Sequence, residues 1–293
     1  MFYQKSLGSR IFDVCNYIIL GLLVIVTLYP CYYVLVASVS DPIAISASNG
    51  MLFYPKGFAL YTYKEVLRSA QIWSGYRNTL IYVVCGGLLS VVLTVTAAFA
   101  LTRKGLPGKN VVMFLILFTM YFSGGLIPMY LVVKGVGMLD SPLAMIVPNA
   151  INTYNLIITI SYFKSMPYSL EEAAKIDGAN DYSILLKIMV PLAKPIIAVI
   201  SLYYLVALWN DFFHALIYLD SRNLFPLQLV LREILIQNNT AAVAATGTAD
   251  EGLAYAENVK YATIVVSTVP ILCVYPFIQK YFVKGVMIGA IKG

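Results

Sequence analysis

The chain has 293 residues, of which 60% are hydrophobic and only 12% are charged, and its mean hydropathy is +0.80. This composition excludes a soluble globular domain, because too few polar residues are present to cover the surface of a protein of this size. The net charge of +6 does not indicate nucleic-acid binding, since no basic patch is interleaved with exposed aromatic residues.

Six apolar stretches are long enough to cross a membrane, since a spanning helix needs roughly 20 apolar residues. In chain order they are 12–38, 78–102, 111–133, 141–163, 195–219 and 260–280. The first is much longer than the apolar core of a signal peptide, so we interpret it as an uncleaved span. The prediction is an all-α polytopic membrane protein with six transmembrane helices. Because no linker divides the chain, residues 1–293 are expected to form one transmembrane domain.

Lys and Arg residues predict the orientation. With six spans, both termini lie on the same side of the membrane as the segments 103–109 and 164–194, and this side carries more than half of the 20 Lys and Arg residues in a shorter total length of loop. Cytoplasmic loops are enriched in Lys and Arg. We therefore predict cytoplasmic termini in a multi-pass protein of the plasma membrane.

Motifs for catalysis are missing from the sequence. It contains no phosphate loop of the form G-x-x-x-x-G-K-[ST] and no G-x-S-x-G. The four cysteines lie in apolar stretches and are not spaced like metal ligands. We therefore expect no enzymatic activity, no metal site and no cofactor in this chain.

Polar residues in the fourth apolar stretch are candidates for a transport path. Asn152, Asn155, Thr159 and Tyr162 fall on one helical face, and Asn149 lies one turn earlier. Polar groups in hydrocarbon are costly, so this face is expected to point into the bundle or into a wet cavity. Hydrogen bonding between helices remains the more common role for any single asparagine.

The fifth stretch carries a second polar face, formed by Tyr203, Asn210 and His214, with Tyr204 and Asp211 beside it. An unpaired carboxylate is difficult to accommodate in a membrane. Asp211 either binds substrate or pairs with His214 one turn away, and the sequence leaves both roles open. A proton relay is poorly supported, because this is the single acidic residue deep in a span.

A polar segment separates the fourth and fifth stretches and reads SLEEAAKIDGANDYSILLKIMVP over 169–191. Ser169 and Glu172 have the spacing of a capping box, which predicts a helix over 170–176. Gly178 is placed to end this helix in a left-handed backbone conformation.

A second short helix is expected to follow in the same segment. Either Asn180 or Asp181 can cap it, and it should run over 182–189 until Pro191 ends it. The segment is therefore predicted to form a helix-turn-helix at the cytoplasmic mouth of the bundle. The small residues Ala173 and Ala174 would permit close approach of another surface.

This segment resembles the cytoplasmic loop of binding-protein-dependent ABC importer permeases, whose pattern is E-A-A-x2-D-G-A-x5-F-x2-I-x-L-P. Leu185 stands where Phe is usual and Val190 where Leu is usual, and both changes are conservative. The positions that match are Glu172, Ala173, Ala174, Asp177, Gly178, Ala179, Ile188 and Pro191.

The resemblance covers nearly the whole chain. Segments 78–109, 209–219 and 279–293 are similar to the maltose-type sugar permeases, the last to the tail of their maltose-permease-like subunit. Segment 225–235 resembles the LplC-like branch, which imports oligosaccharides and polysaccharide fragments in Gram-positive bacteria.

The resemblance implies a set of partners in a bacterial cell membrane. They are a different second permease that forms a heterodimer with this chain, two ATPase subunits that bind ATP and Mg, and an extracellular lipoprotein that delivers the carbohydrate. The helix-turn-helix would be the coupling helix that docks on the ATPase. Glu172 would either cap this helix or pair with a basic residue of the ATPase.

Two other functions compete with this interpretation. A secondary sugar transporter needs no ATPase and is expected to show internal repeats or buried acidic relays. A membrane glycosyltransferase needs a catalytic carboxylate or a metal site near an interface, for which Asp211 alone is weak support. The helix-turn-helix motif favours the ABC importer over both.

Overall fold

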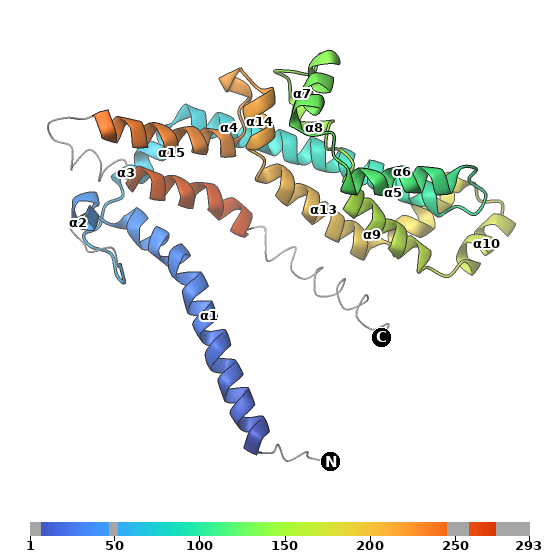
Figure 1. Ribbon diagram of the computed structural model, residues 1–293, viewed down its shortest axis with the longest axis horizontal. Helices are drawn as coiled ribbons and strands as arrows, with labels where there is room; N and C mark the ends of the chain where they lie inside the picture. The colour runs from blue at the N-terminus through green and yellow to red at the C-terminus, as the bar shows by residue number, and fades with distance from the viewer. Residues whose placement is uncertain (1–6, 47–51, 245–257, 274–293) are drawn as a thin grey trace. The chain divides into compact units, whose positions relative to one another are not determined.

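The computed structural model describes residues 7–46, 52–244 and 258–273. Within these ranges all regular elements are helices, which confirms the predicted all-α class (Figure 1). The chain divides into two compact units, one formed by Met1–Ser69 with Glu233–Pro270 and the other by Ala70–Arg232 with Ile271–Gly293. Each unit is described separately.

The first unit contains the long helix α1 (Leu7–Val39), the short helices α2 (Pro42–Ser46) and α3 (Tyr61–Arg68), the part of α15 (Leu227–Ala244) from Glu233, and most of an apolar helix over Asn258–Cys273. The last helix covers the first part of the predicted stretch 260–280, whose remainder lies outside the described residues.

Asn258 is the polar centre of the first unit, and its side chain is completely buried. Its amide Nδ2 donates to the carbonyl oxygens of Ala37 and Ser40 at 2.9 and 3.0 Å. Its Oδ1 accepts a hydrogen bond from the hydroxyl of Thr62 at 2.6 Å. One side chain therefore connects the last described helix, the end of α1 and the start of α3.

The second unit begins with a continuous apolar helix over Ala70–Thr102, which is made of α4, a π-helical turn η1 and α5. The elements of the unit are α4 (Ala70–Ile81), η1 (Tyr82–Gly86), α5 (Gly87–Thr102), α6 (Lys109–Tyr121), α7 (Leu126–Gly135), α8 (Pro142–Ile146), α9 (Thr153–Lys164), α10 (Ser169–Ile176), α11 (Asp181–Ser183), η2 (Ile184–Met189), α12 (Val190–Leu192), α13 (Lys194–Trp209), α14 (Phe213–Tyr218), η3 (Arg222–Leu224) and the start of α15 (Leu227–Ala244).

Two described helices, Gly8–Val39 and Ala70–Thr102, are long and apolar enough to cross a membrane on their own. Two bent pairs raise the number to four if each pair forms one span. Helices α6 and α7 meet at 119°, and the helix over Asp181–Leu192 meets α13 at 83°. The six-span topology therefore stays a prediction.

Three of the predicted stretches are not single helices. Stretch 111–133 breaks at residues 122–125, where Gly125 has a left-handed φ of 89°. Stretch 141–163 is divided into α8 and α9, and stretch 195–219 is interrupted at residues 210–212. Apolar composition measures how much of a segment can enter hydrocarbon, and it does not report where the helical hydrogen bonds stop.

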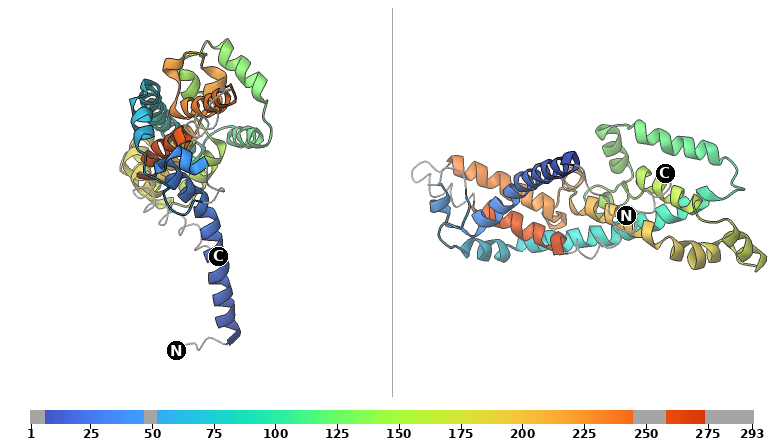
Figure 2. Two further views of the ribbon diagram at one scale, coloured as in Figure 1. Left: turned by 90° about the vertical axis from the view of Figure 1, so that its left-hand side faces the viewer. Right: turned by 90° about the horizontal axis from the view of Figure 1, so that it is seen from below.

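Helices α5, α9 and α13 form the core of the second unit, and the views agree that they lie side by side (Figures 1 and 2). The buried residues of this core include Phe99, Leu156 and Ile200. Gly87 on α5 faces α13, because a Cβ atom at this position would lie 2.9 Å from Cδ2 of Leu205 and the leucine side chain would have to shift. Helix α10 lies at one end of this group (Figures 1 and 2).

Asp140 fastens two loops elsewhere in the second unit. It adopts a left-handed φ of 51°, which is uncommon for a residue with a side chain. Its carboxylate accepts hydrogen bonds from the amides of Asp220 at 3.0 Å and Ser221 at 2.8 Å, and from the hydroxyl of Ser221 at 2.5 Å. These bonds lower the pKa of Asp140, the hydroxyl of Ser221 having the largest effect.

Helix η3 and the residue that follows it are also held by side chains, in this case from the first part of the long helix. Asn78 donates from Nδ2 to the carbonyl oxygens of Asn223 at 2.7 Å and Phe225 at 3.1 Å. The hydroxyl of Tyr82 donates to the carbonyl oxygen of Leu224 at 2.7 Å. These bonds satisfy carbonyl oxygens at and after the end of a short helix.

Candidate coupling loop and transport path

Helix α10 begins where the sequence predicts, but not with the predicted cap. Tyr168 occupies the N-cap position and makes no side-chain cap bond, while the amide of Glu172 donates to the carbonyl oxygen of Tyr168 at 3.1 Å. The capping box of Ser169 and Glu172 is therefore wrong, because a backbone carbonyl already takes the amide that the serine was expected to bind. The side chain of Glu172 is exposed and available to a partner.

The end of α10 confirms the role predicted for Gly178. This residue has a φ of 79°, and its amide donates to the carbonyl oxygen of Lys175 at 3.0 Å. The amide of Ala179 donates to the carbonyl oxygen of Ala174 at 2.9 Å. Together these bonds form a Schellman motif, in which glycine is favoured by the left-handed backbone.

The two small residues of α10 have different surroundings. Ala174 is 7% exposed and belongs to the core of the second unit, whereas Ala173 is exposed. Ala173 alone therefore leaves room on the outer face of the helix. The other matched positions divide in the same way, with Glu172, Asp177, Gly178 and Pro191 exposed and Ala179 and Ile188 half-buried.

Asn180, and not Asp181, caps the second helix, because its Oδ1 accepts the amide of Ser183 at 2.9 Å. This helix continues to Leu192, so the prediction that Pro191 ends it is wrong. Pro191 lies near the end of this continuous helix, just after the π-helical turn η2, and it has no amide to donate to the helix there. The sharp bend follows at Ala193, between α12 and α13.

A polar junction joins three core helices. The buried hydroxyl of Tyr204, on α13, lies 2.7 Å from the hydroxyl of Thr94 on α5. The same hydroxyl accepts a hydrogen bond from the amide of Asn152 at 2.9 Å. Asn152 in turn caps α9, since its Oδ1 accepts the amide of Asn155 at 3.1 Å. Tyr204 was predicted only to lie beside a polar face, and no pattern in the sequence indicates this contact.

The polar face predicted for the fourth stretch is present only in part. Asn155 and Thr159 are buried on α9, with the hydroxyl of Thr159 bonded to the carbonyl oxygen of Asn155 at 2.7 Å. Asn149 is not one turn earlier on the same helix, because the helix starts after Asn152. It is exposed in the break between α8 and α9.

Asp211 pairs with His214, which confirms one of its two predicted roles. Nδ1 of His214 lies 2.9 Å from Oδ2 of Asp211, and Nε2 lies 3.3 Å from Nδ2 of Asn149. If Nδ1 carries a proton toward the carboxylate, Nε2 is free to accept from the amide of Asn149. This polar triad contains groups that can donate to and accept from sugar hydroxyls.

The face predicted for Tyr203, Asn210 and His214 is wrong, because the break after α13 separates the first from the last. Asn210 bonds back to the carbonyl oxygen of Val206 at 2.9 Å. The ring of Tyr203 lies 6.4 Å from the ring of Tyr154 on α9. No cluster of three potential metal ligands occurs among the residues that the structure describes.

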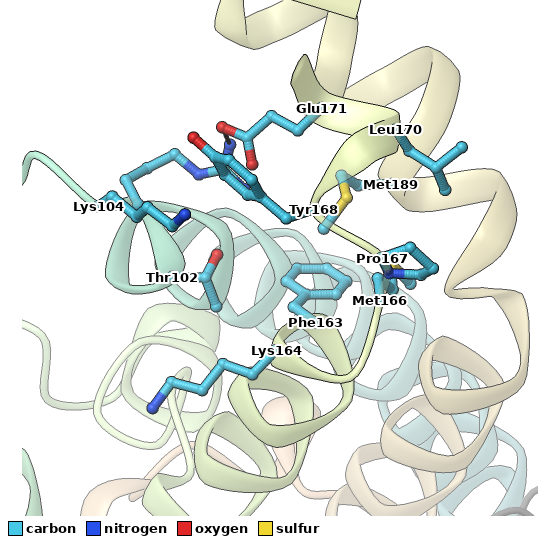
Figure 3. Close-up of a pocket in the computed structure, with 11 residues that line it drawn as sticks. Thr102, Lys104, Phe163, Lys164, Met166, Pro167, Tyr168, Leu170, Glu171 and Met189 are labelled. Carbon is cyan, nitrogen blue, oxygen red and sulfur yellow. Dashed lines mark ion pairs between the residues drawn. The ribbon is translucent and has the colours of Figure 1, made fainter. Parts of the chain in front are cut away.

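A cavity of about 200 Å³ lies where the end of α5, the end of α9 and the start of α10 meet (Figure 3). Arg103 forms an ion pair with Glu171 beside it, and the ammonium group of Lys104 lies 3.4 Å above the ring of Tyr168. These contacts are not predictable from the sequence, since they join residues far apart in the chain.

Comparison with known proteins identifies relatives of the whole chain. Protein LplC of Bacillus subtilis (strain 168) is 40% identical over 290 residues, which cover 99% of this chain and 98% of that protein. The polygalacturonan/rhamnogalacturonan transport system permease protein YtcP of the same organism is 39% identical over 285 residues, covering 97% and 99%.

Solved structures agree with these sequence relatives. A chain of a bacterial ABC transporter involved in the import of the acidic polysaccharide alginate matches with a TM-score of 0.85 and 34% identity, covering 95% of this chain and 99% of that chain. A chain of an alginate transporter in complex with an alginate pentasaccharide-bound periplasmic protein is similar in fold, with a TM-score of 0.53 and 15% identity.

The family model described as binding-protein-dependent transport system inner membrane component matches residues 90–288, which include most of α5, the segment 169–191, the polar junction and the polar triad. The chain therefore belongs to this family of ABC transporter permeases.

Proposed function

We propose that this chain is the permease subunit of an importer for an oligosaccharide or a polysaccharide fragment, and that α10 is its coupling helix. One observation carries the proposal: α10 is a short, firmly ended helix that exposes Glu172 and Ala173. A helix of this kind moves as a body, so it can transmit a displacement from an ATPase that binds its exposed face.

The substrate class is supported by the relatives and by the chemistry of the polar triad. The names of the relatives specify alginate, polygalacturonan and rhamnogalacturonan as cargo of those systems. Asn149, Asp211 and His214 offer amide, carboxylate and imidazole groups to a sugar, and Asn152, Asn155, Tyr203 and Asn210 complete the proposed path.

The proposed assembly contains a different second permease, two ATPase subunits that bind ATP and Mg, and an extracellular lipoprotein that delivers the sugar. The structure of an alginate transporter with its periplasmic protein supports such an arrangement. The charge bias of the loops supports cytoplasmic termini in a bacterial cell membrane, with the coupling segment on the same side.

Gly178→Asp tests the coupling role. A Cβ atom at this position meets nothing within 4 Å, so the cost within this chain comes from the φ of 79°, which is about 1 kcal/mol. The variant is expected to insert and to pair with the second permease but to lose the ATPase. Co-purification of the ATPase and ATP turnover stimulated by loaded binding protein in vesicles measure the effect.

Gly108→Asp is the matched control. Gly108 has a φ of 70°, nothing lies within 4 Å of its Cβ position, and it belongs to another loop on the predicted cytoplasmic side. It therefore suffers the same backbone strain and gains the same charge away from α10. Wild-type stimulation in Gly178→Asp, or an equal loss in both variants, contradicts the coupling role.

Asp211→Ala tests the path. We expect uptake to fall while assembly persists, because the pair with His214 connects residues close in sequence and leaves the core helices in place. Asp211→Asn keeps the shape and separates the loss of charge from the loss of contact. Normal uptake of the sugar by Asp211→Ala would remove this residue from the path.

A further inference from the structure

Glu171 and Glu172 are neighbours on α10 with opposite surroundings. The side chain of Glu171 is 12% exposed, and its carboxylate pairs with Arg103 and, at 2.8 Å, with Lys175. The hydrogen bond that Lys175 donates to Glu171 raises the pKa of Lys175. Glu172 is exposed. The inner carboxylate therefore serves this chain, while the outer one is free for a partner.

Arg103 is held firmly to α5, which it follows directly. Its side chain is 16% exposed, its guanidinium group lies 3.9 Å from the centre of the Phe99 ring, and its Nε donates to the carbonyl oxygen of Phe99 at 3.3 Å. Stacking and a directed hydrogen bond restrict the orientation of a planar guanidinium group more than they would restrict a lysine ammonium group. Displacement of Glu171 therefore acts on the end of α5.

A second contact joins the same two elements. Lys104 places its ammonium group over the ring of Tyr168, the residue at the N-cap of α10 (Figure 3). Packing contributes little to the attachment, because Ala174 is the single buried residue of α10. The beginning of α10 is thus attached to the end of α5 mainly through charge.

The other part of α5 reaches the polar junction. Thr94 lies nine positions before Arg103, which corresponds to roughly 14 Å along a helix. Its hydroxyl contacts Tyr204, which binds the amide of Asn152 at the start of α9. A continuous chain of contacts therefore runs from α10 through α5 to the helices that carry the proposed path.

We propose that the Arg103–Glu171 ion pair is a positioning contact that transmits movement of α10 to α5 and thereby to the polar junction. The inference rests on the proposed role of α10 as the coupling helix. It assigns separate tasks to adjacent carboxylates: Glu172 faces the ATPase, and Glu171 passes the displacement on to the membrane helices.

Glu171→Gln, Arg103→Gln and the double variant test the inference in vesicles that contain the complete importer. Each single variant is expected to retain the ATPase by co-purification, yet the stimulation of ATP turnover by loaded binding protein should fall about fivefold or more, the lower range of an allosteric coupling. The double variant should lose no more than either single variant, because both remove one interaction.

Glu172→Gln is the matched control, with the same chemical change on the adjacent residue. It is expected to weaken retention of the ATPase while the stimulation of each retained ATPase stays at the wild-type ratio. Equal behaviour of Glu171→Gln and Glu172→Gln would overturn the division of tasks. Additive losses in the double variant, or wild-type stimulation in both single variants, would overturn the inference as well.

Thermal unfolding of the detergent-purified complex distinguishes a loss of coupling from a general loss of stability. If Arg103→Gln fails to assemble, the inference is tested with Glu171→Gln alone, because this change keeps the length of the side chain. An unfolding temperature lowered in proportion to the lost stimulation contradicts a positioning role. The proposed function itself fails in a different way, namely if the wild-type chain retains no ATPase or shows no stimulation.

Discussion

Tyr204→Phe removes one oxygen atom from the point where α5, α9 and α13 meet. The ring stays in place, so packing is conserved and the change isolates the hydrogen bonds to Thr94 at 2.7 Å and from the amide of Asn152 at 2.9 Å. Tyr204 is 4% exposed and Thr94 is completely buried, so water does not readily replace the lost hydroxyl.

Two opposing effects determine how much stability Tyr204→Phe should lose. Leaving a buried polar group without its partner costs about 1–3 kcal/mol in proteins. Hydrogen bonds between membrane helices are worth about 0.6 kcal/mol on average, because the freed group finds other partners. The hydroxyl of Thr94 can turn to a carbonyl oxygen of its own helix, whereas the amide of Asn152 lies before the first turn of α9 and cannot. We therefore expect a loss of about 1–2 kcal/mol.

Reversible unfolding in mixed detergent micelles, followed by circular dichroism, measures this loss. Thr94→Val and the double variant complete a cycle, in which the two single losses should exceed the double loss by about 0.5 kcal/mol or more. A Tyr204→Phe variant as stable as the wild type, or strict additivity in the cycle, would refute the junction as a connection between the helices.

Three further predictions follow. Asp140→Asn should be less stable than the wild type at neutral pH. Because the folded pKa of Asp140 is depressed, the stability contributed by the bonds to Ser221 is present above the unfolded value of about 3.9 and is lost as the pH falls through the folded value. The difference between variant and wild type should therefore be smaller at pH 3 than at pH 7, which unfolding at both pH values checks. Asn258→Ala should lower the free energy of unfolding by about 2–3 kcal/mol, since it removes the side-chain partner of the buried Ser40 carbonyl oxygen and of the buried Thr62 hydroxyl, whereas equal thermal stability would contradict that role. In a background without native cysteines, a cysteine that replaces Ser183 should not react with a membrane-impermeant reagent in intact cells, whereas one that replaces Ala242 should react. Labelling at position 183 would contradict the predicted orientation.

The sequence predicts helices better than it predicts their interruptions. The helical class follows from long apolar stretches, which the structure confirms. The breaks differ in how visible they are: Gly124 and Gly125 mark the first, and Pro148 lies in the second. Residues 210–212 contain neither glycine nor proline, and the third break is marked only by Asn210 and Asp211. Asp211 accepts the amide of His214 at 3.2 Å, as a residue that caps a helix does, so this weaker signal is also local.

The same distinction applies to the candidate site. The role of Gly178 was predictable because a left-handed turn is a local requirement of the backbone. The pair of Asp211 and His214 was also within reach, since the residues are three positions apart. The contact of Arg103 with Glu171 and the bonds of Asn258 join residues distant in sequence, and a single sequence contains no signal for such contacts.

The interruptions of the helices have a consequence for how the importer can change its cargo during evolution. Asn149, Asn210 and Asp211 lie in or beside breaks, where a new side chain need not satisfy helix propensity or fit between packed helices. Tyr204 and Thr94, by contrast, are buried between the core helices and are bonded to each other. If the proposed path is correct, recognition of the sugar can diverge at the breaks while the packed core helices are conserved.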